Sequence, residues 1–144
     1  MARVLSVGYL QEFLKKRNEH IAGGGHTVIP ATSIEQALAL ASEDKFDVMV
    51  FGHFVPTEDR NTIARYFKEH FPLIAIIFLY ETHIEKAELA DAILNVHGDP
   101  QDLVQTITYL HQRQHTDWAG RAKGLACFSA MVLPSSLNYI FRIM

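Results

Sequence analysis

Short apolar runs alternate along the chain with longer amphipathic segments. Five runs have the length of a strand, at residues 3–8, 26–31, 46–51, 73–79 and 92–96. The runs 46–51 and 73–79 are almost continuously apolar, which is typical of strands that are covered on both faces. The pattern therefore predicts five buried strands, with 73–79 at the centre of the sheet.

The segments between these runs place apolar residues at helical spacing. They predict helices over 9–21, 33–41, 59–70 and 82–90, and a last helix that begins after residue 99. The first helix is expected to turn Lys15, Lys16 and Arg17 outward. It is expected to bury four apolar residues, Leu10, Phe13, Leu14 and Ile21.

Helix ends are marked by local signals. Two segments have the spacing of a capping box, Ser33 with Gln36 and Thr82 with Glu85. Three glycines at 23–25 are expected to end the first helix, because glycine tolerates the left-handed turn found there. Pro100 suits the first position of the last helix, where its missing N–H costs no hydrogen bond.

Strands that alternate with helices of this length predict right-handed crossovers and a parallel sheet. We expect an α/β fold, a doubly wound five-stranded parallel sheet built as (βα)5 in flavodoxin-like or receiver order. In such sheets, ligand sites lie beyond the carboxyl ends of the strands. The domain is expected to cover residues 1–114.

Residues 115–144 form a C-terminal extension outside this pattern, expected to be helical or partly disordered. Its segment 124–141 is uncharged and rich in apolar residues, but Pro134, Ser135, Ser136 and Asn138 interrupt it. Three interpretations stay open. The segment packs on the domain or a partner, it is a poorly ordered extension, or it contacts a membrane; the interruptions argue against a span.

Composition excludes several classes of function. The 144 residues are 49% hydrophobic and 20% charged, with a formal net charge of −3, which indicates no nucleic-acid partner. Cys127 is the only cysteine, so the chain forms no internal disulfide and no thiolate metal cluster. The apolar run at the N-terminus is too short for a signal peptide. We therefore expect a cytoplasmic protein.

Several short segments of the sequence occur in an order that is known from one protein family. Residues 46–56 read Phe-Asp-Val-Met-Val-Phe-Gly-His-Phe-Val-Pro, and Asp59 follows in the next loop. Phe71-Pro72 precedes the fourth predicted strand, and Ala90-Asp91 precedes the fifth. In this order, residues 3–113 resemble the receiver domain of two-component response regulators. In that family the third strand leads to a phosphorylated aspartate, and a proline follows four residues later.

The positions that carry the family's phosphorylation chemistry are all changed, so the resemblance implies a degenerate receiver. Gly52 stands at the phosphoacceptor position and has no side chain to phosphorylate. Gly8 and Tyr9 replace the acidic pair, which leaves little to hold Mg²⁺, a cation that prefers oxygen ligands. Tyr80 stands where the family has a small hydroxyl residue at the end of the fourth strand. Val96 stands at the position of the lysine that ends the fifth strand, and Ile93 at the aromatic switch position within that strand.

Two nearby residues could be considered as substitute acceptors. Asp47 precedes Gly52 by five residues, and at roughly 3.3 Å per strand residue it lies about 16 Å away, at the amino end of the sheet. His53 is at the correct end and could accept a phosphoryl group. A lone histidine without a metal or a lysine is, however, typical of a turn or surface position.

These observations predict a signalling module that acts by protein–protein contact in a two-component or phosphorelay pathway, without phosphorylation. We expect no enzymatic activity, cofactor or metal, and a protein partner or a second copy of the chain. In the family, the face of the fourth helix, fifth strand and fifth helix commonly binds partners. Carried over, this suggests four contact residues, Tyr80, Ile84, Ile93 and Tyr109.

Two alternatives stay open. The first is a small flavodoxin-like protein that binds a ligand or acts as an enzyme, using the polar groups at the strand ends, Tyr9, His53, Tyr80 and His97. The second is a receiver that is phosphorylated at an atypical residue.

Overall fold

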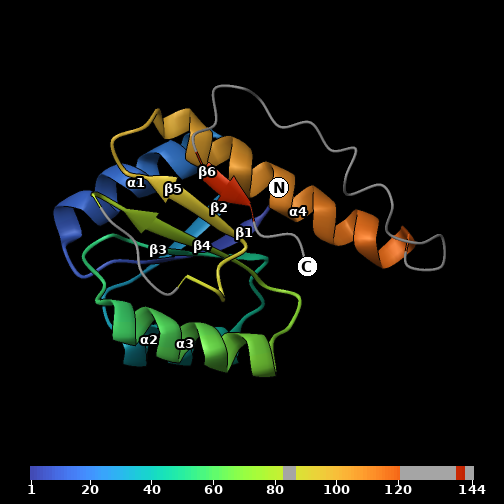
Figure 1. The fold of residues 1–144 in the computed structure, drawn as a ribbon. Coiled ribbons are helices and arrows are strands. Elements are labelled where there is room, and N and C mark those ends of the chain that lie inside the picture. The colour runs from blue at the N-terminus through green and yellow to red at the C-terminus, as the bar shows by residue number, and fades with distance from the viewer. Residues whose placement is uncertain (83–86, 121–138, 142–144) are drawn as a thin grey trace.

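The computed structural model describes residues 1–82, 87–120 and 139–141, and the side chains up to residue 114. Five parallel strands and one antiparallel strand form a single sheet in the order β2-β1-β3-β4-β5-β6 (Figure 1). The strands are β1 (Arg3–Val7), β2 (Thr27–Ala31), β3 (Val48–Phe51), β4 (Ala75–Tyr80), β5 (Ala92–Asn95) and β6 (Tyr139–Phe141). The predicted five-stranded parallel α/β fold is confirmed.

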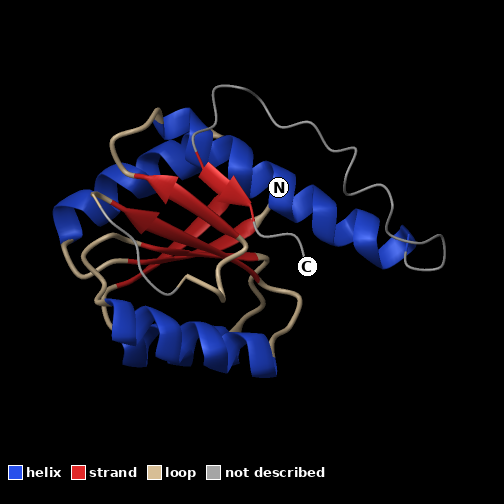
Figure 2. Cartoon of the chain, viewed as in Figure 1, coloured by secondary structure: helices blue, strands red, loops and turns tan. Residues whose placement is uncertain are grey.

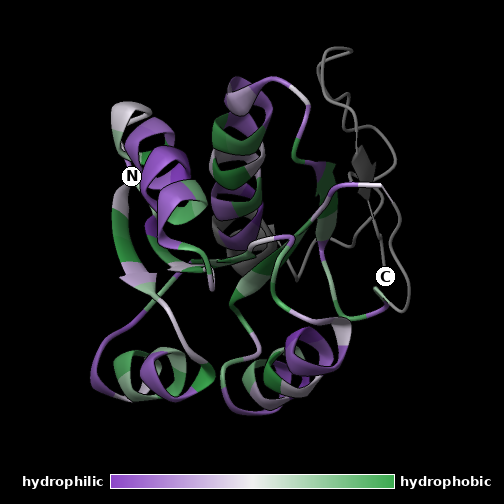
Figure 3. Ribbon diagram, turned by 90° about the vertical axis from the view of Figure 1, so that its left-hand side faces the viewer, coloured by the Kyte–Doolittle hydropathy of each residue, from purple (hydrophilic) through white to green (hydrophobic). Residues whose placement is uncertain are grey.

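Helices cover both faces of this sheet, as Figure 2 shows. Helices α1 (Gln11–Gly23) and α4 (Pro100–Gly120) pack on one face through Ile21, Leu103 and Ile107. Helices α2 (Ile34–Glu43) and α3 (Thr57–His70) pack on the other, where Phe67 is fully buried. The strands are mostly apolar and the helices carry one hydrophilic side (Figure 3), so two hydrophobic layers sandwich the sheet.

Three of the predicted helix ends are confirmed. The Ser33 hydroxyl accepts a hydrogen bond from the Gln36 amide at 3.1 Å and caps α2. Helix α1 ends at Gly23, and Gly25 has a φ of 91°, in the left-handed region that glycine tolerates. Helix α4 begins at Pro100, after Asp99 accepts a hydrogen bond from the Gln101 amide.

The segment between β4 and β5 differs from the prediction of a helix over 82–90. Its described residues, 81–82 and 87–91, form bends and turns, and Glu85 lies outside the described residues. Asp91 donates its amide hydrogen to Ile76 and accepts the Ile76 amide hydrogen through Oδ2, both at 2.7 Å. These tertiary hydrogen bonds hold Asp91, which precedes β5, against β4, and a capping pattern cannot reveal them.

The chain after residue 113 also differs from the expectation. Helix α4 continues to Gly120, so the domain boundary expected at 114 falls inside a helix. Strand β6 was not predicted, and it pairs antiparallel with β5. The interrupted part of the apolar tail and Cys127 lie outside the described residues. Within the part of the chain that the structure describes, no helix is both long enough and apolar enough to cross a membrane.

His26 joins the N-terminus to α4 and makes stability depend on pH. Its Nδ1 accepts a hydrogen bond from the Ala2 amide at 3.0 Å, and its Nε2 lies 2.9 Å from the Thr108 hydroxyl. Burial, followed by the nearby terminal amino group, lowers the pKa of His26 below its ordinary value of 6.5. The unfolded chain therefore takes up this proton at a higher pH than the folded chain.

We expect the free energy of unfolding to fall as the pH drops through 6.5 towards the lowered pKa of His26. One such group changes stability by at most about 1.4 kcal/mol per pH unit. In urea unfolding at several pH values, His26→Gln should show a smaller slope than the wild type. His70→Gln, at an exposed position at the end of α3, is the control and should keep the wild-type slope; equal slopes in all three proteins would contradict this role of His26.

Candidate functional site

The five positions singled out in the sequence come together at one edge of the sheet. Gly8 and Tyr9 follow β1, Gly52 follows β3, Tyr80 ends β4 and Val96 follows β5. The Gly52 amide donates to the Val7 carbonyl at 2.9 Å, and the Val96 amide donates to the Tyr80 carbonyl at 2.8 Å. We call this the carboxyl edge, because the carboxyl ends of the parallel strands meet there.

Arg17 reaches this edge from α1. The residue is only 9% exposed, although the sequence pattern assigned it to the outer face of the helix. Its Nε and Nη2 both lie 3.1 Å from the Ser6 hydroxyl, and Nη2 donates to the Val7 carbonyl at 2.9 Å. The guanidinium group therefore lies over the end of β1 and is held by neutral oxygens.

The two glycines of the edge make room for this guanidinium. A Cβ atom at Gly52 would lie 2.8 Å from Nη1 of Arg17, and a Cβ atom at Gly8 would lie 3.0 Å from Nη2. Real Cβ atoms essentially never approach another atom as closely as at Gly52, and the contact at Gly8 would be tighter than nearly all real ones. The position of the phosphoacceptor in the resemblance is therefore filled by a cation, and a side chain at Gly52 would have to displace it.

Arg60 places a second buried guanidinium beside the first. It is 6% exposed, donates to the Val55 carbonyl at 2.9 Å and to the Gly52 carbonyl at 2.8 Å, and lies 5.4 Å from the ring centre of Phe78. These bonds tie the loop after β3 to the first turns of α3. Arg60 thus links the loop that carries Gly52 to α3.

The two arginines give the edge a positive charge. Burial lowers the pKa of each to about 10, and the charge of Arg60 contributes to the lowering at Arg17. Both remain protonated at neutral pH. Because an unpaired buried charge is costly, the neutral oxygens around each guanidinium are needed to hold it in the folded state.

The two aspartates singled out in the sequence, Asp59 and Asp47, each accept a hydrogen bond from another residue. Asp59 accepts a hydrogen bond from the Tyr9 hydroxyl at 2.9 Å, and burial together with Asp59 raises the pKa of Tyr9 to about 12. Asp47 lies at the amino end of β3, where it accepts the Arg3 amide hydrogen at 2.9 Å. The predicted position of Asp47 at the amino end of the sheet is thus confirmed.

These residues do not fit the Mg²⁺ site that the resemblance implies. Gly8 and Gly52 offer no side-chain oxygen, and a guanidinium group lies where the cation would have to approach them. Among the residues described, no three or more histidine, cysteine, aspartate or glutamate side chains gather closely enough to hold a metal.

An apolar patch lies beside the edge. Leu10, Phe13 and Phe54 are each between 44% and 47% exposed, and the rings of Phe13 and Phe54 are 5.3 Å apart. The expectation that Leu10 and Phe13 are buried core residues is therefore wrong. The inward face of α1 is Leu14, Arg17 and Ile21, whereas Leu10 is the N-cap residue and precedes the first turn of the helix.

His53 lies under this patch. Its ring is 4.2 Å from that of Phe54, and its Nε2 lies 3.4 Å from Oε2 of Glu81. Burial is the largest influence on His53 and lowers its pKa, against the opposing effect of Glu81. His53 is therefore mainly neutral at neutral pH and can donate a hydrogen bond from one ring nitrogen only.

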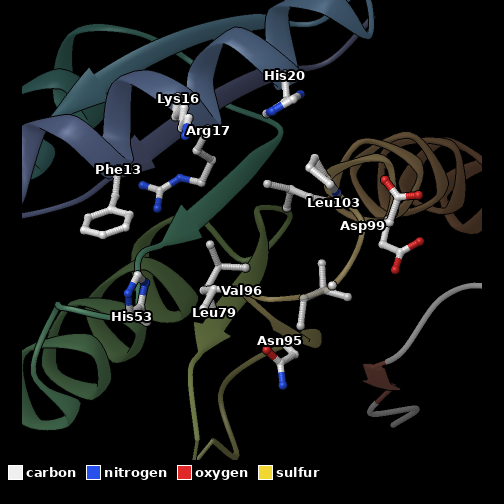
Figure 4. Close-up of a pocket in the computed structure, with 14 residues that line it drawn as sticks. Phe13, Lys16, Arg17, His20, His53, Leu79, Asn95, Val96, Asp99 and Leu103 are labelled. Carbon is white, nitrogen blue, oxygen red and sulfur yellow. The ribbon is translucent and has the colours of Figure 1, made fainter.

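A cavity of about 190 Å³ opens between α1 and the turn that joins β5 to α4 (Figure 4). Arg17 and His53 line one side, Lys16 and His20 come from the same helix as Arg17, and Leu79, Leu94 and Leu103 line the apolar part. Of the degenerate positions, Val96 alone lines this cavity.

The four predicted contact residues do not form one exposed face. Ile93 is only 3% exposed and its strand pairs with β6, so a partner cannot reach this side chain. Tyr80 and Tyr109 are half-buried, and Ile84 lies outside the described residues.

The sequence reasoning missed Arg17 and Arg60. One signal was available for Arg17, which lies three residues after Leu14 and four before Ile21, on the buried stripe of α1. Arg60 likewise lies three residues before Ile63. A charged residue on an apolar stripe indicates a buried polar contact, but the spacing does not reveal the atoms that receive it.

Comparisons with known proteins connect this chain to one fold. No protein-family model matches it, and no curated protein matches it in sequence. Among solved structures, it is similar to the CheY-like receiver domain protein of Methanospirillum hungatei, with a TM-score of 0.70, 19% identity, and coverage of 81% of this chain and 98% of that one.

Two further structures agree. Chemotaxis response regulator CheY4 of Vibrio cholerae is similar with a TM-score of 0.66, 23% identity and coverage of 76% and 98%. The response regulator TrrA of Thermotoga maritima, solved in complex with Mg²⁺-BeF, is similar with a TM-score of 0.67 and 18% identity, and the match covers 76% of this chain and 99% of that one. The element order, the sheet topology and these three similarities lead to one conclusion: the described part of this chain has the fold of a CheY-like response regulator receiver domain.

Proposed function

We propose that this chain is a receiver-like regulatory module of a two-component or phosphorelay pathway that acts by protein–protein contact and is not controlled by phosphorylation. The observation that carries the proposal is the Arg17 guanidinium at the carboxyl edge, 2.8 Å from the position of a Cβ atom at Gly52. A phosphoryl acceptor and its divalent cation both require carboxylates there. This edge instead holds a cation against two glycines.

Arg60 supports the same proposal through conformation. A receiver controlled by phosphorylation requires an edge that can adopt two arrangements. Here the Gly52 carbonyl accepts a hydrogen bond from Arg60. The Arg60 guanidinium also lies over the Phe78 ring, which adds a second restraint on the loop after β3. The module is therefore held in one state, and its partner recognises that state directly.

The apolar patch supports contact with a protein. Leu10, Phe13 and Phe54 are exposed side by side, and large exposed apolar side chains that gather at one place are typical of interaction surfaces. We prefer this patch to the face that contains the buried Ile93. The alternative of a flavodoxin-like enzyme has less support, because two of the four polar groups it would use are engaged, Tyr9 by Asp59 and His53 by Glu81.

Incubation with acetyl phosphate and Mg²⁺ is expected to leave the intact mass of the protein unchanged. Gly52→Asp should also stay unmodified, because Gly8 and Tyr9 still supply no carboxylate for the cation and Arg17 pairs with the new one. A stoichiometric phosphate adduct on the wild type would overturn the proposal. An adduct only on Gly52→Asp would show that a single residue, not the whole edge, prevents phosphorylation.

Mg²⁺ with beryllium fluoride provides a second measurement. We expect no shift in the melting temperature of this protein, because Gly8 and Gly52 offer no side-chain oxygen and the Arg17 guanidinium lies beside them. The Thermotoga maritima protein, solved with Mg²⁺-BeF, is the positive control. A rise in melting temperature that depends on both additives would contradict the proposal.

The patch can be tested by the pair Leu10→Ser and Phe54→Ser. In cells treated with a cross-linker, a partner captured by the wild type should be lost with both variants. Leu73→Ser is the matched control, since Leu73 is also apolar and 60% exposed but precedes β4 at the opposite edge. Stability should change little at such exposed positions. Capture of the same proteins by all four chains would exclude the patch as the contact surface.

A further inference from the structure

The cavity between α1 and the β5–α4 turn, here called the α1–α4 cavity, combines a buried cation with an apolar interior. Leu79, Leu94 and Leu103 form its apolar part, and Arg17 reaches it from α1. Figure 4 shows the Arg17 guanidinium extending towards the side where Phe13 and His53 lie. A charge held beside apolar surface is a common arrangement for recognising one charged group on an otherwise apolar molecule.

Arg17 has hydrogen-bonding capacity left. Nε and Nη2 donate to Ser6 and Val7, whereas Nη1 donates to no atom of the residues described and lies next to Gly52. No carboxylate of the described residues pairs with this guanidinium, which is more than nine-tenths buried. An anion in the cavity would supply the missing partner.

The other charges around the cavity favour an anion on the Arg17 side. Lys16 and His20 line the cavity from the same helix as Arg17. The acidic lining residues, Asp99 and Asp102, belong to the start of α4, and Asp99 already accepts the Gln101 amide hydrogen. In Figure 4, Asp99 lies at the end of the cavity away from Arg17 and His53.

Size and donor number narrow the class of ligand. A cavity of about 150 Å³ accommodates one benzene ring, and this one measures about 190 Å³. One free guanidinium nitrogen offers few donors, which suits a carboxylate with two acceptor oxygens better than a phosphate group with three.

We propose that the α1–α4 cavity binds a small organic carboxylate whose apolar body is about one ring in size, with the carboxylate on Arg17 and the apolar body against Leu79, Leu94 and Leu103. Such a ligand would reach the carboxyl edge without phosphorylation. Binding requires no protein partner, so it can succeed or fail independently of the regulatory function proposed above.

Benzoate is the probe for the experiment, titrated into the full chain and followed by amide chemical shifts. We expect saturable binding with a dissociation constant on the order of 1 mM or lower, as suits so small a ligand. The largest shifts should fall on residues that line the cavity. Benzamide keeps the ring but not the charge, and inorganic phosphate keeps charge but not the ring, so both should bind at least about tenfold more weakly.

Adjacent lysines provide a matched pair of variants. Lys16 lines the cavity, whereas Lys15 is exposed on the same helix and does not. Lys16→Gln should weaken benzoate binding roughly two- to fivefold, the size of an exposed charge interaction, and Lys15→Gln should leave it unchanged. Arg17→Gln should weaken it about tenfold or more. Should Arg17→Gln fail to fold, the comparison of Lys16→Gln with Lys15→Gln tests the charge on the same side of the cavity.

Two results would overturn the proposal. The first is the absence of saturable benzoate binding to the wild type. The second is equal binding of benzoate and benzamide, or equal effects of Lys15→Gln and Lys16→Gln, since either would show that the cavity does not recognise the negative charge.

Discussion

The buried guanidinium group of Arg17 is the contact on which the carboxyl edge of the sheet depends. It brings α1 to the end of β1, where its donors meet Ser6 and Val7, and it takes up the space that Cβ atoms at Gly8 and Gly52 would occupy. A charge removed from water requires every nearby oxygen that can stabilise it. The small residues at the edge and the polar Ser6 within an otherwise apolar strand therefore have one physical explanation.

Arg60 extends this arrangement to the second half of the edge. Its donors hold the loop after β3 to the start of α3, and Arg17 and Arg60 together replace with positive charge the negative charge on which a phosphorylated receiver depends. The fold thus has the receiver topology, with two guanidinium groups at its carboxyl edge. A positive charge there favours an anionic ligand over a divalent cation.

The edge therefore offers two surfaces of different character. The apolar patch of Leu10, Phe13 and Phe54 faces outward and suits a protein, whereas the α1–α4 cavity lies beneath it and suits a small anion. Phe13 belongs to both, because it lines the cavity and contacts Phe54. A ligand in the cavity would touch the patch through this ring, which provides a physical route between the two.

The sequence by itself determined the α/β class, the five strands and three of the helix ends, because these follow from local periodicity, from capping at Ser33 and from the glycines that end α1. It also determined that Gly52 cannot accept a phosphoryl group. The tertiary structure decided what occupies the edge. Arg17 and Arg60 act through atoms far along the chain, and helical spacing shows which stripe a residue joins but not which oxygens it meets. The same reason explains the segment before β5, where Asp91 binds Ile76 and long-range hydrogen bonds prevail over a local helical signal.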